Sequence, residues 1–220
     1  PSFTFNGQSS FYIGTPENFN KENNTEIYGM YEVPKLKLRL TGRYLLLSNF
    51  TYYKDFKQPA QYNTLFNVLQ VSAEKSFRLT KDFNWRTWVI VQQPTGSAPL
   101  NLPLIFTKNQ ISYDGNLGFK NLRTSFGFEI RYWTPYNGDG YSPLLGQFFN
   151  QNDEKIKLNF PETAGYMHFR IKSFTAYIRV ENLNSLDLAS GGFVNNNIVS
   201  PNYPYPGLLF RVGIYWSFVN

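Results

Sequence analysis

The residues with the clearest capacity for chemistry are cations that alternate with leucine. In "KLKLRLTGRYLLL", residues 35–47, Lys37, Arg39 and Arg43 share one parity and the leucines between them share the other. Successive side chains of a β-strand point to opposite faces, so this strand would carry positive charge on one face and hydrocarbon on the other. The pattern predicts a sheet that separates water from an apolar phase, with a polar face that interacts with ions.

The same parity identifies charged positions on the other predicted strands. An Arg or Lys on the lipid side of a membrane strand costs about 2–4 kcal/mol at mid-bilayer, so the charged parity must face an enclosed lumen if the strands cross a membrane. Rings of Lys and Arg in an aqueous pore favour anions. The alternative is that cations and glutamates form ion-pair networks that only fill the interior. The candidate lumen-lining residues are Lys37, Arg39, Arg43, Arg86, Lys108, Glu129, Arg131, His168, Arg170, Arg179, Glu181 and Arg211.

Two other groups of residues take positions near the ends of the predicted strands. Lys35 and Lys172 lie beside predicted turns, so they are candidates for charges at the rim of the wall. Aromatic side chains often sit at headgroup depth in membrane barrels. The candidates for such a girdle are Tyr44, Trp85, Trp133, Tyr177, Trp216 and Phe218, and ordinary sheet packing is the alternative.

Residues suited to catalysis or metal binding are scarce. His168 is the only histidine and the chain has no cysteine, which excludes a multi-histidine or thiolate metal site. The acidic loops "NGDG" and "QNDE" lack the ligand spacing of a calcium loop, and no nucleophile elbow or phosphate-binding glycine loop occurs. We therefore expect no enzyme, no metal and no cofactor. The net charge of +6 fits an anionic partner, but cations interleaved with apolar residues argue against nucleic acid.

The elements that would position these residues are long β-strands, because alternation at period two recurs along the chain and helical periodicity is nearly absent. Many of the predicted strands have ten residues or more, as in "NLRTSFGFEIRYWT". Strands of soluble proteins average about 5–6 residues, whereas membrane-spanning strands need roughly 9–11. The predicted strands are 2–13, 25–33, 35–50, 64–79, 83–93, 104–115, 121–134, 162–172, 174–184 and 207–219.

Long and short connections alternate between these strands. Residues 135–161 and 185–206 are long, whereas Val33-Pro34 and Lys172-Ser173 are tight. In an antiparallel meander this places all long loops at one end, as in outer-membrane barrels. We predict one all-β domain over residues 1–220, an up-and-down transmembrane β-barrel of about ten strands or the C-terminal part of a larger barrel. A soluble lipid-binding barrel is the alternative, and it requires the apolar parity to point inward.

Four segments carry a resemblance to a known family. From about residue 100 to the end, the sequence resembles the putative porin family of the Bacteroidetes outer membrane, and residues 25–99 fit it more loosely. The final strand, with "RVENLN" before it, is also similar to the C-terminal strands of TonB-dependent receptors. The resemblance implies an outer-membrane β-barrel with pore activity, of which this chain is the C-terminal portion. The matching segments are "LNLPLIFTKNQISYDG", "FGFEIRYWTPYNGDGYSPLLGQFFNQND", "GYMHFRIKSFTAYIRVENLN" and "PNYPYPGLLFRVGIYWSFVN".

Two hypotheses follow for the function. In the first, the chain is a passive, mildly anion-leaning diffusion channel of the bacterial outer membrane, with membrane lipid and small anionic or polar solutes as its partners. The second is a structural barrel subunit of a larger outer-membrane assembly, in which residues 135–161 and 185–206 dock partner protein subunits. In the first hypothesis, the residues that set the electrostatic field inside the pore are Arg39, Arg43, Arg131, Arg170, Arg179 and Arg211.

Overall fold

A computed structural model describes most of the chain as β-structure. The described residues are 3–5, 8–9, 12–13, 17–56, 58–187, 189–193, 197–198, 200–203 and 206–217, with side chains from residue 19 onward. Within these ranges the helical elements are two 3-10 turns, η1 (Pro34–Leu36) and η2 (Leu183–Ser185). No helix in the described part of the chain is long and apolar enough to span a membrane.

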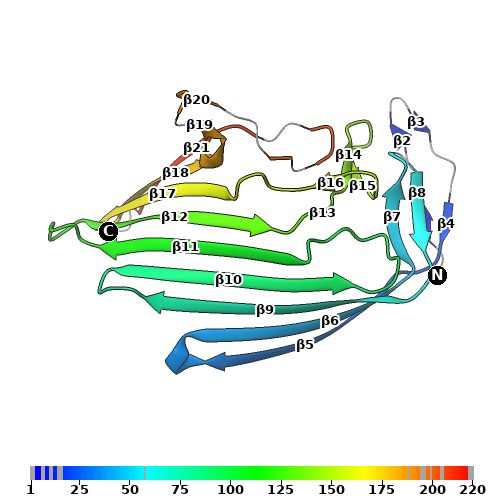
Figure 1. Cartoon of the computed structure of the whole chain (residues 1–220), viewed down its shortest axis with the longest axis horizontal. Coiled ribbons are helices and arrows are strands. Elements are labelled where there is room, and N and C mark those ends of the chain that lie inside the picture. Colours follow the sequence, from blue (N-terminus) through cyan, green and yellow to red (C-terminus); the bar gives the residue numbers. More distant parts are fainter. Residues whose placement is uncertain are drawn as a thin grey trace.

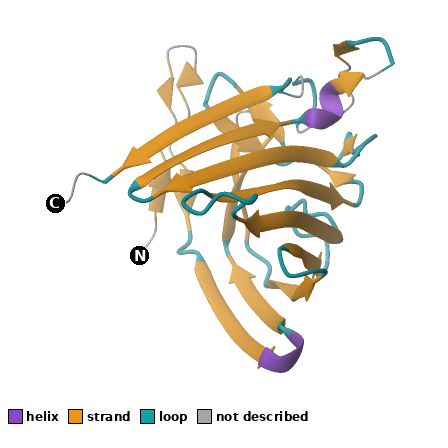
Figure 2. Cartoon of the chain, turned by 90° about the vertical axis from the view of Figure 1, so that its left-hand side faces the viewer, coloured by secondary structure: helices purple, strands orange, loops and turns teal. Residues whose placement is uncertain are grey.

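Nine antiparallel strands form one large sheet, in which neighbours in space are neighbours along the meander (Figure 1). The sheet is curved but not closed, and β5 and β21 are its edges among the described residues (Figure 2). In chain order, the strands are β5 (Asn23–Val33), β6 (Leu38–Ser48), β9 (Phe66–Arg78), β10 (Phe83–Pro94), β11 (Ile105–Gly115), β12 (Arg123–Trp133), β17 (Glu162–Ile171), β18 (Phe174–Glu181) and β21 (Leu209–Trp216).

The remaining strands are short and pair two by two outside the large sheet. Figure 1 shows β7, β8 and β13 to β16 gathered at one end of the sheet, which we call the long-loop end; the tight connections lie at the other, the short-turn end. The pairs are β1 (Phe3–Phe5) with β4 (Glu17–Phe19), β2 (Gln8–Ser9) with β3 (Tyr12–Ile13), β7 (Phe50–Lys54) with β8 (Gln58–Tyr62), β13 (Tyr136–Asn137) with β16 (Lys155–Ile156), β14 (Gly140–Ser142) with β15 (Gln147–Phe149) and β19 (Leu186–Asp187) with β20 (Gly192–Phe193).

The structure corrects two of the predicted strands. The strand predicted over 35–50 begins only at Leu38, because Pro34 opens η1 and Lys37 takes a left-handed conformation with φ 47°. It ends before Asn49, where φ is 55°. The described parts of the strand predicted over 2–13 pair outside the large sheet, and the rest of that range lies outside the described residues. Among the described residues, the large sheet therefore has nine strands.

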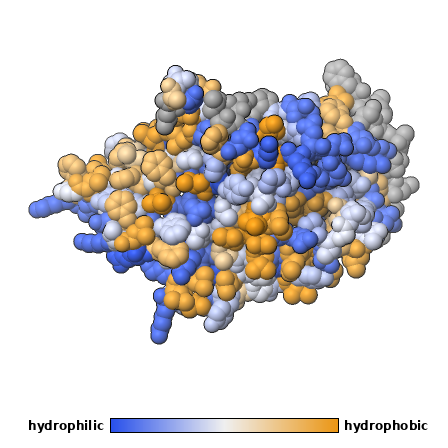
Figure 3. Space-filling model, viewed as in Figure 1, coloured by the Kyte–Doolittle hydropathy of each residue, from blue (hydrophilic) through white to orange (hydrophobic). Residues whose placement is uncertain are grey.

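The two faces of the sheet differ in the way that the alternation predicts. One face, here called the apolar face, presents Ile27, Val71, Phe128, Val212 and Ile214 with 50–69% of their surface exposed. Figure 3 shows hydrophobic residues across the middle of the strands, with hydrophilic residues at the lower part of the short-turn end and over the long connections at the other end. A soluble barrel would pack this parity into a core. Exposed apolar surface of this extent instead marks contact with lipid or protein.

Few apolar side chains of the described residues are buried. They are Phe66, Val68, Ile156 and Ala164. Ile156 belongs to β16 in a long connection, and Phe66 begins β9 at the long-loop end. The sheet is thus held together mainly by its hydrogen-bonded ladder, and its apolar face has no packed partner within the described part of the chain.

Candidate functional site

The polar face of the sheet, opposite the apolar face, carries the charged side chains of the strands apart from Lys75. The strand register sets this arrangement. Lys108 of β11 stands directly opposite Arg131 of β12, and Arg131 stands opposite Glu162 of β17. At the other side of the sheet, Arg39 of β6 stands opposite Glu74 of β9. Residues distant in sequence therefore meet in rows across the strands.

Glu129 is the centre of an ion-pair network on this face. Its residue surface is only 5% exposed. Its Oε2 lies 2.9 Å from Lys108 Nζ, and its Oε1 lies 2.6 Å from Arg131 Nη2 and 3.1 Å from Arg179 Nη2. Arg179 reaches it from β18 across β17, where the residue opposite Glu129 is the small Ala164. Three cations thus share one carboxylate, and Arg131 also lies 3.8 Å from a carboxylate oxygen of Glu162.

The network continues towards the β21 edge through Glu181. Its Oε1 lies 2.8 Å from Arg179 Nε, and its Oε2 lies 2.9 Å from Arg211 Nε. A second set of ion pairs lies towards the β5 edge. The Nε of Arg39 lies 2.5 Å from an oxygen of Glu32. This second set is well exposed, and exposed pairs contribute only about 0–1 kcal/mol each.

Arg86, Arg123, Arg170 and Lys37 differ from these paired cations. Among the described residues, none of them has a carboxylate oxygen within 4.0 Å. The guanidinium of Arg86 lies 5.6 Å from the centre of the Trp88 ring, a cation–π distance. Arg123 and Arg170 stand directly opposite each other in the β12–β17 pair. Their charges are therefore not cancelled locally.

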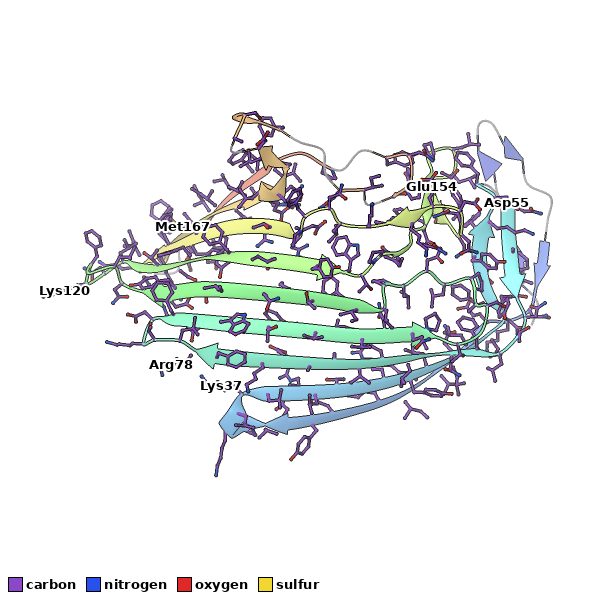
Figure 4. All side chains as sticks on the ribbon, viewed as in Figure 1. Lys37, Asp55, Arg78, Lys120, Glu154 and Met167 are labelled. Atoms are coloured by element: carbon purple, nitrogen blue, oxygen red, sulfur yellow. The ribbon has the colours of Figure 1, made fainter. Side chains whose placement is uncertain are left out.

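A polar cavity of about 600 Å³ is lined by two of these four uncompensated cations, Lys37 and Arg86, and its lining also includes Asp114. Its lining includes Lys37, Arg86, His168 and Tyr166, and side chains from several neighbouring strands. Gln110 donates a hydrogen bond to the Tyr166 hydroxyl at 2.5 Å. Figure 4 shows Lys37 at the short-turn end together with Arg78 and Lys120, whereas the acidic Asp55 and Glu154 lie at the long-loop end. The lining of the cavity suits a hydrated anion or a polar solute, and the arrangement indicates binding or passage of the solute instead of a chemical reaction.

The predicted site residues therefore fall into two groups. The ion-paired group is larger, which agrees with the alternative that cations and glutamates form networks. Arg86, Arg170, His168 and Lys37 make up the other group, and Lys37 belongs to a turn instead of a strand. Whether they line a lumen stays a prediction. The ion-paired group comprises Arg39, Arg43, Lys108, Glu129, Arg131, Arg179, Glu181 and Arg211.

The sequence reasoning missed some residues of this face and misplaced others. Arg123 was not a candidate, although its parity within 121–134 matches that of Arg131. The carboxylates that neutralise Arg39 and Arg43 were missed, although they alternate in the strand predicted over 25–33. Tyr177 is not a girdle residue, because its ring lies 5.7 Å from that of His168 on the polar face. Phe218 lies outside the described residues.

The long connections form a structured cap at the long-loop end. Asn197 is 1% exposed and joins the connection after β18 to the connection after β12. Its Oδ1 accepts hydrogen bonds from the backbone N–H groups of Asn159 and Phe160, and its Nδ2 donates to the carbonyl of Phe160 at 2.9 Å. Ser200 Oγ donates to the carbonyl of Asp139 at 2.9 Å. We call the described residues of 134–161, 182–203 and the β7–β8 hairpin the loop cap.

The hairpin joins the loop cap through backbone and aromatic contacts. The N–H of Asn150 donates to the carbonyl of Tyr53 at 2.8 Å, and the rings of Phe56 and Phe149 are 5.6 Å apart. Burial raises the pKa of Asp139 in the cap, although a hydrogen bond from Asn101 opposes this rise. Three separate connections therefore hold one another in place.

Replacement of Asn197 by alanine is expected to loosen the loop cap. The change removes the hydrogen bonds to buried backbone groups, and each group left unsatisfied costs about 1–3 kcal/mol. Limited proteolysis within residues 135–161 should then become faster, while the strands of the large sheet stay protected. Asn152→Ala is the matched control, because Asn152 is exposed. Equal proteolysis of both variants would show that Asn197 does not hold the cap together.

The comparisons with known proteins give one positive result. A family model described as "Putative porin" matches residues 1–220 of the chain. No significant match to a curated protein or to a solved structure was found.

Proposed function

Because the chain belongs to the putative porin family, whose members are non-enzymatic β-barrel diffusion channels of the bacterial outer membrane, we propose that its polar face lines a passive channel that mildly prefers anions. The observation that carries the preference is the set of uncompensated cations Arg86, Arg123 and Arg170 on the polar face, of which Arg86 lines the polar cavity. Small anionic or polar solutes would diffuse through, and membrane lipid would cover the apolar face.

Uncompensated cations contribute more than paired cations to the electrostatic field inside the pore. A carboxylate within about 4 Å of a guanidinium cancels much of the potential of that cation a few ångströms away. The screening length is about 8 Å at physiological salt, so an uncompensated cation acts across a pore of molecular width. We therefore assign the selectivity to Arg86, Arg123 and Arg170 and no longer to Arg39, Arg43, Arg131, Arg179 or Arg211.

Reversal potentials in planar bilayers under a salt gradient test this proposal. The unaltered protein, extracted from its membrane, should favour chloride over potassium. The triple variant Arg86→Gln, Arg123→Gln and Arg170→Gln should lower that permeability ratio by about two-fold or more, because the charges that attract anions are gone.

A charge-neutral variant provides the control. Removing an ion pair as a whole, with Arg43→Gln and Glu26→Gln together, leaves the net charge unchanged. The permeability ratio of this double variant should stay at the level of the unaltered protein. A sealed barrel, a preference for cations, or an equal shift in the control would each contradict the proposal.

A structural role is the second candidate function, and the loop cap favours it. Interlocked loops present a preformed surface, which suits docking of partner protein subunits in a larger outer-membrane assembly. Stoichiometric co-purification of partners without measurable conductance would favour this role over diffusion. The Bacteroidetes origin and the similarity to TonB-dependent receptors stay predictions from the sequence.

A further inference from the structure

Lys75 is the exception to the separation of charge between the two faces. Among the described strands of the large sheet, it is the one charged residue whose parity puts it on the apolar face. It shares that parity with Val71 and stands opposite Leu38 of β6 and Thr87 of β10. A charge on the lipid side of a membrane strand is costly unless it reaches the headgroup region or a partner of opposite charge.

The ammonium group of Lys75 is directed towards the short-turn end. Its Nζ lies 4.8 Å from the centre of the Phe77 ring, and Phe77 is closer than Lys75 to the end of β9 at that side. The Phe77 ring stacks on Trp85 of β10, with 4.7 Å between the ring centres. Aromatic side chains gather at headgroup depth in membrane barrels. The aliphatic stem of Lys75 therefore lies along apolar surface while its charge reaches the headgroup region.

No carboxylate of the described residues neutralises Lys75, because none has an oxygen within 4.0 Å of its Nζ. The neighbouring Glu74 points to the polar face, where it lies 3.5 Å from Arg39. Thr87, directly opposite Lys75, adds a hydroxyl group to the apolar face. An ammonium group and a hydroxyl group are donors that suit the oxygens of a phosphate.

The tight connections add positive charge at the same end of the sheet. Each of them contains a lysine, and the one carboxylate within them is that of Asp82. Figure 4 shows Lys37, Arg78 and Lys120 at this end, whereas the labelled carboxylates lie at the long-loop end. Cations beside a membrane surface attract anionic headgroups. The connections are 34–37, 79–82, 116–122 and 172–173, and their lysines are Lys35, Lys37, Lys81, Lys120 and Lys172.

We propose that Lys75 binds the phosphate group of an anionic phospholipid in the leaflet that meets the short-turn end, and that the lysines of the tight connections attract this lipid class. Short turns of outer-membrane barrels face the periplasm, so the lipid belongs to the periplasmic leaflet. Its acyl chains lie against exposed apolar residues such as Leu40 and Val71. This inference rests on the contact of the apolar face with lipid, and it does not need ion conduction.

Native mass spectrometry of the full-length protein, released from detergent micelles, tests the site. The probes are phosphatidylglycerol, which is anionic, and phosphatidylcholine, which carries a phosphate but no net charge. We expect phosphatidylglycerol to bind more tightly. Lys75→Gln should weaken its binding about five-fold, which is the effect of one cation beside an anionic lipid. Lys75→Arg should keep the affinity, because a guanidinium also binds phosphate.

Lys157→Gln is the matched control, because Lys157 is an exposed lysine of the loop cap at the other end of the sheet. This variant should bind phosphatidylglycerol like the unaltered protein. Equal binding of the two lipids, or an equal loss in both glutamine variants, overturns the proposal. Displacement of the lipid by free glycerol phosphate also overturns it, because the site would then recognise a soluble anion. So does a co-purifying protein that Lys75→Gln releases while lipid binding stays unchanged.

Urea unfolding in vesicles separates lipid binding from a role in folding. In phosphatidylcholine vesicles, Lys75→Gln should unfold at a urea concentration at least as high as the unaltered protein, because a charge has left the lipid side. With phosphatidylglycerol present, the variant should unfold at lower urea concentration, because a bound lipid stabilises the unaltered protein. An equal decrease in both kinds of vesicle contradicts the proposal. Conductance enters none of these readouts, so failure of the channel proposal is distinguishable from failure of this one.

Discussion

Val71→Arg is expected to prevent stable insertion into the outer membrane, whereas Ser72→Arg beside it is tolerated. Val71 lies near the middle of β9 on the apolar face and is 50% exposed. An arginine facing lipid at this depth costs about 2–4 kcal/mol, which is a large part of the stability of a marginally stable protein. Ser72 points to the polar face, where it lines a cavity with Arg39 and Arg43.

Urea unfolding in lipid vesicles measures this difference, because both variants add the same side chain to adjacent positions of one strand. The Val71 variant should unfold at lower urea concentration or fail to insert, and the Ser72 variant should stay within about 1 kcal/mol of the unaltered protein. The opposite order would mean that the apolar face is covered by protein and that the polar face meets lipid. Equal effects would mean that the strand does not cross the bilayer.

The strands could be predicted from the sequence because their signal is local. Alternation within 64–79 or 121–134 depends only on neighbouring residues, and β9 and β12 begin and end within two residues of these ranges. The strand ends were harder to predict from the sequence. Residues with a left-handed backbone, such as Lys37 and Asn49, end the strand although the alternation of residue types continues past them. The alternation of charged and apolar residues within a strand follows from the same period of two, but two of the predicted girdle residues, Trp133 and Tyr177, lie on the polar face.

The pairing of charges could not be predicted in the same way. Arg179 and Glu129 are 50 residues apart and lie on strands that are not neighbours in the sheet. They meet because the register of β17 places Ala164, a small residue, between them. Register depends on the geometry of each connection, and a one-residue slip would move every side chain of a strand to the other face. Parity alone gives the face of a residue but not its partner.

The largest effect on selectivity is expected from Glu129→Gln, which leaves the shape of the side chain nearly unchanged and removes its charge. Lys108, Arg131 and Arg179 then lose a carboxylate that lies 2.6–3.1 Å from each of them. The anion-to-cation permeability ratio should rise by about two-fold or more, because only Glu162 and Glu181 then remain as partners of these cations and the network gains one net positive charge. Breaking a buried ion pair from one side also costs about 3–5 kcal/mol, so the variant should unfold at lower urea concentration.

Measured together, the two readouts separate the roles that this network can have. Glu154→Gln is the control for charge alone, because Glu154 lies in the loop cap and forms none of the ion pairs found among the described residues. If Glu129→Gln lowers stability and leaves the permeability ratio unchanged, the network fills the interior and ions pass elsewhere. If both change while the control changes neither, the carboxylate at the centre of the sheet both holds three strands together and limits the anion preference of the channel.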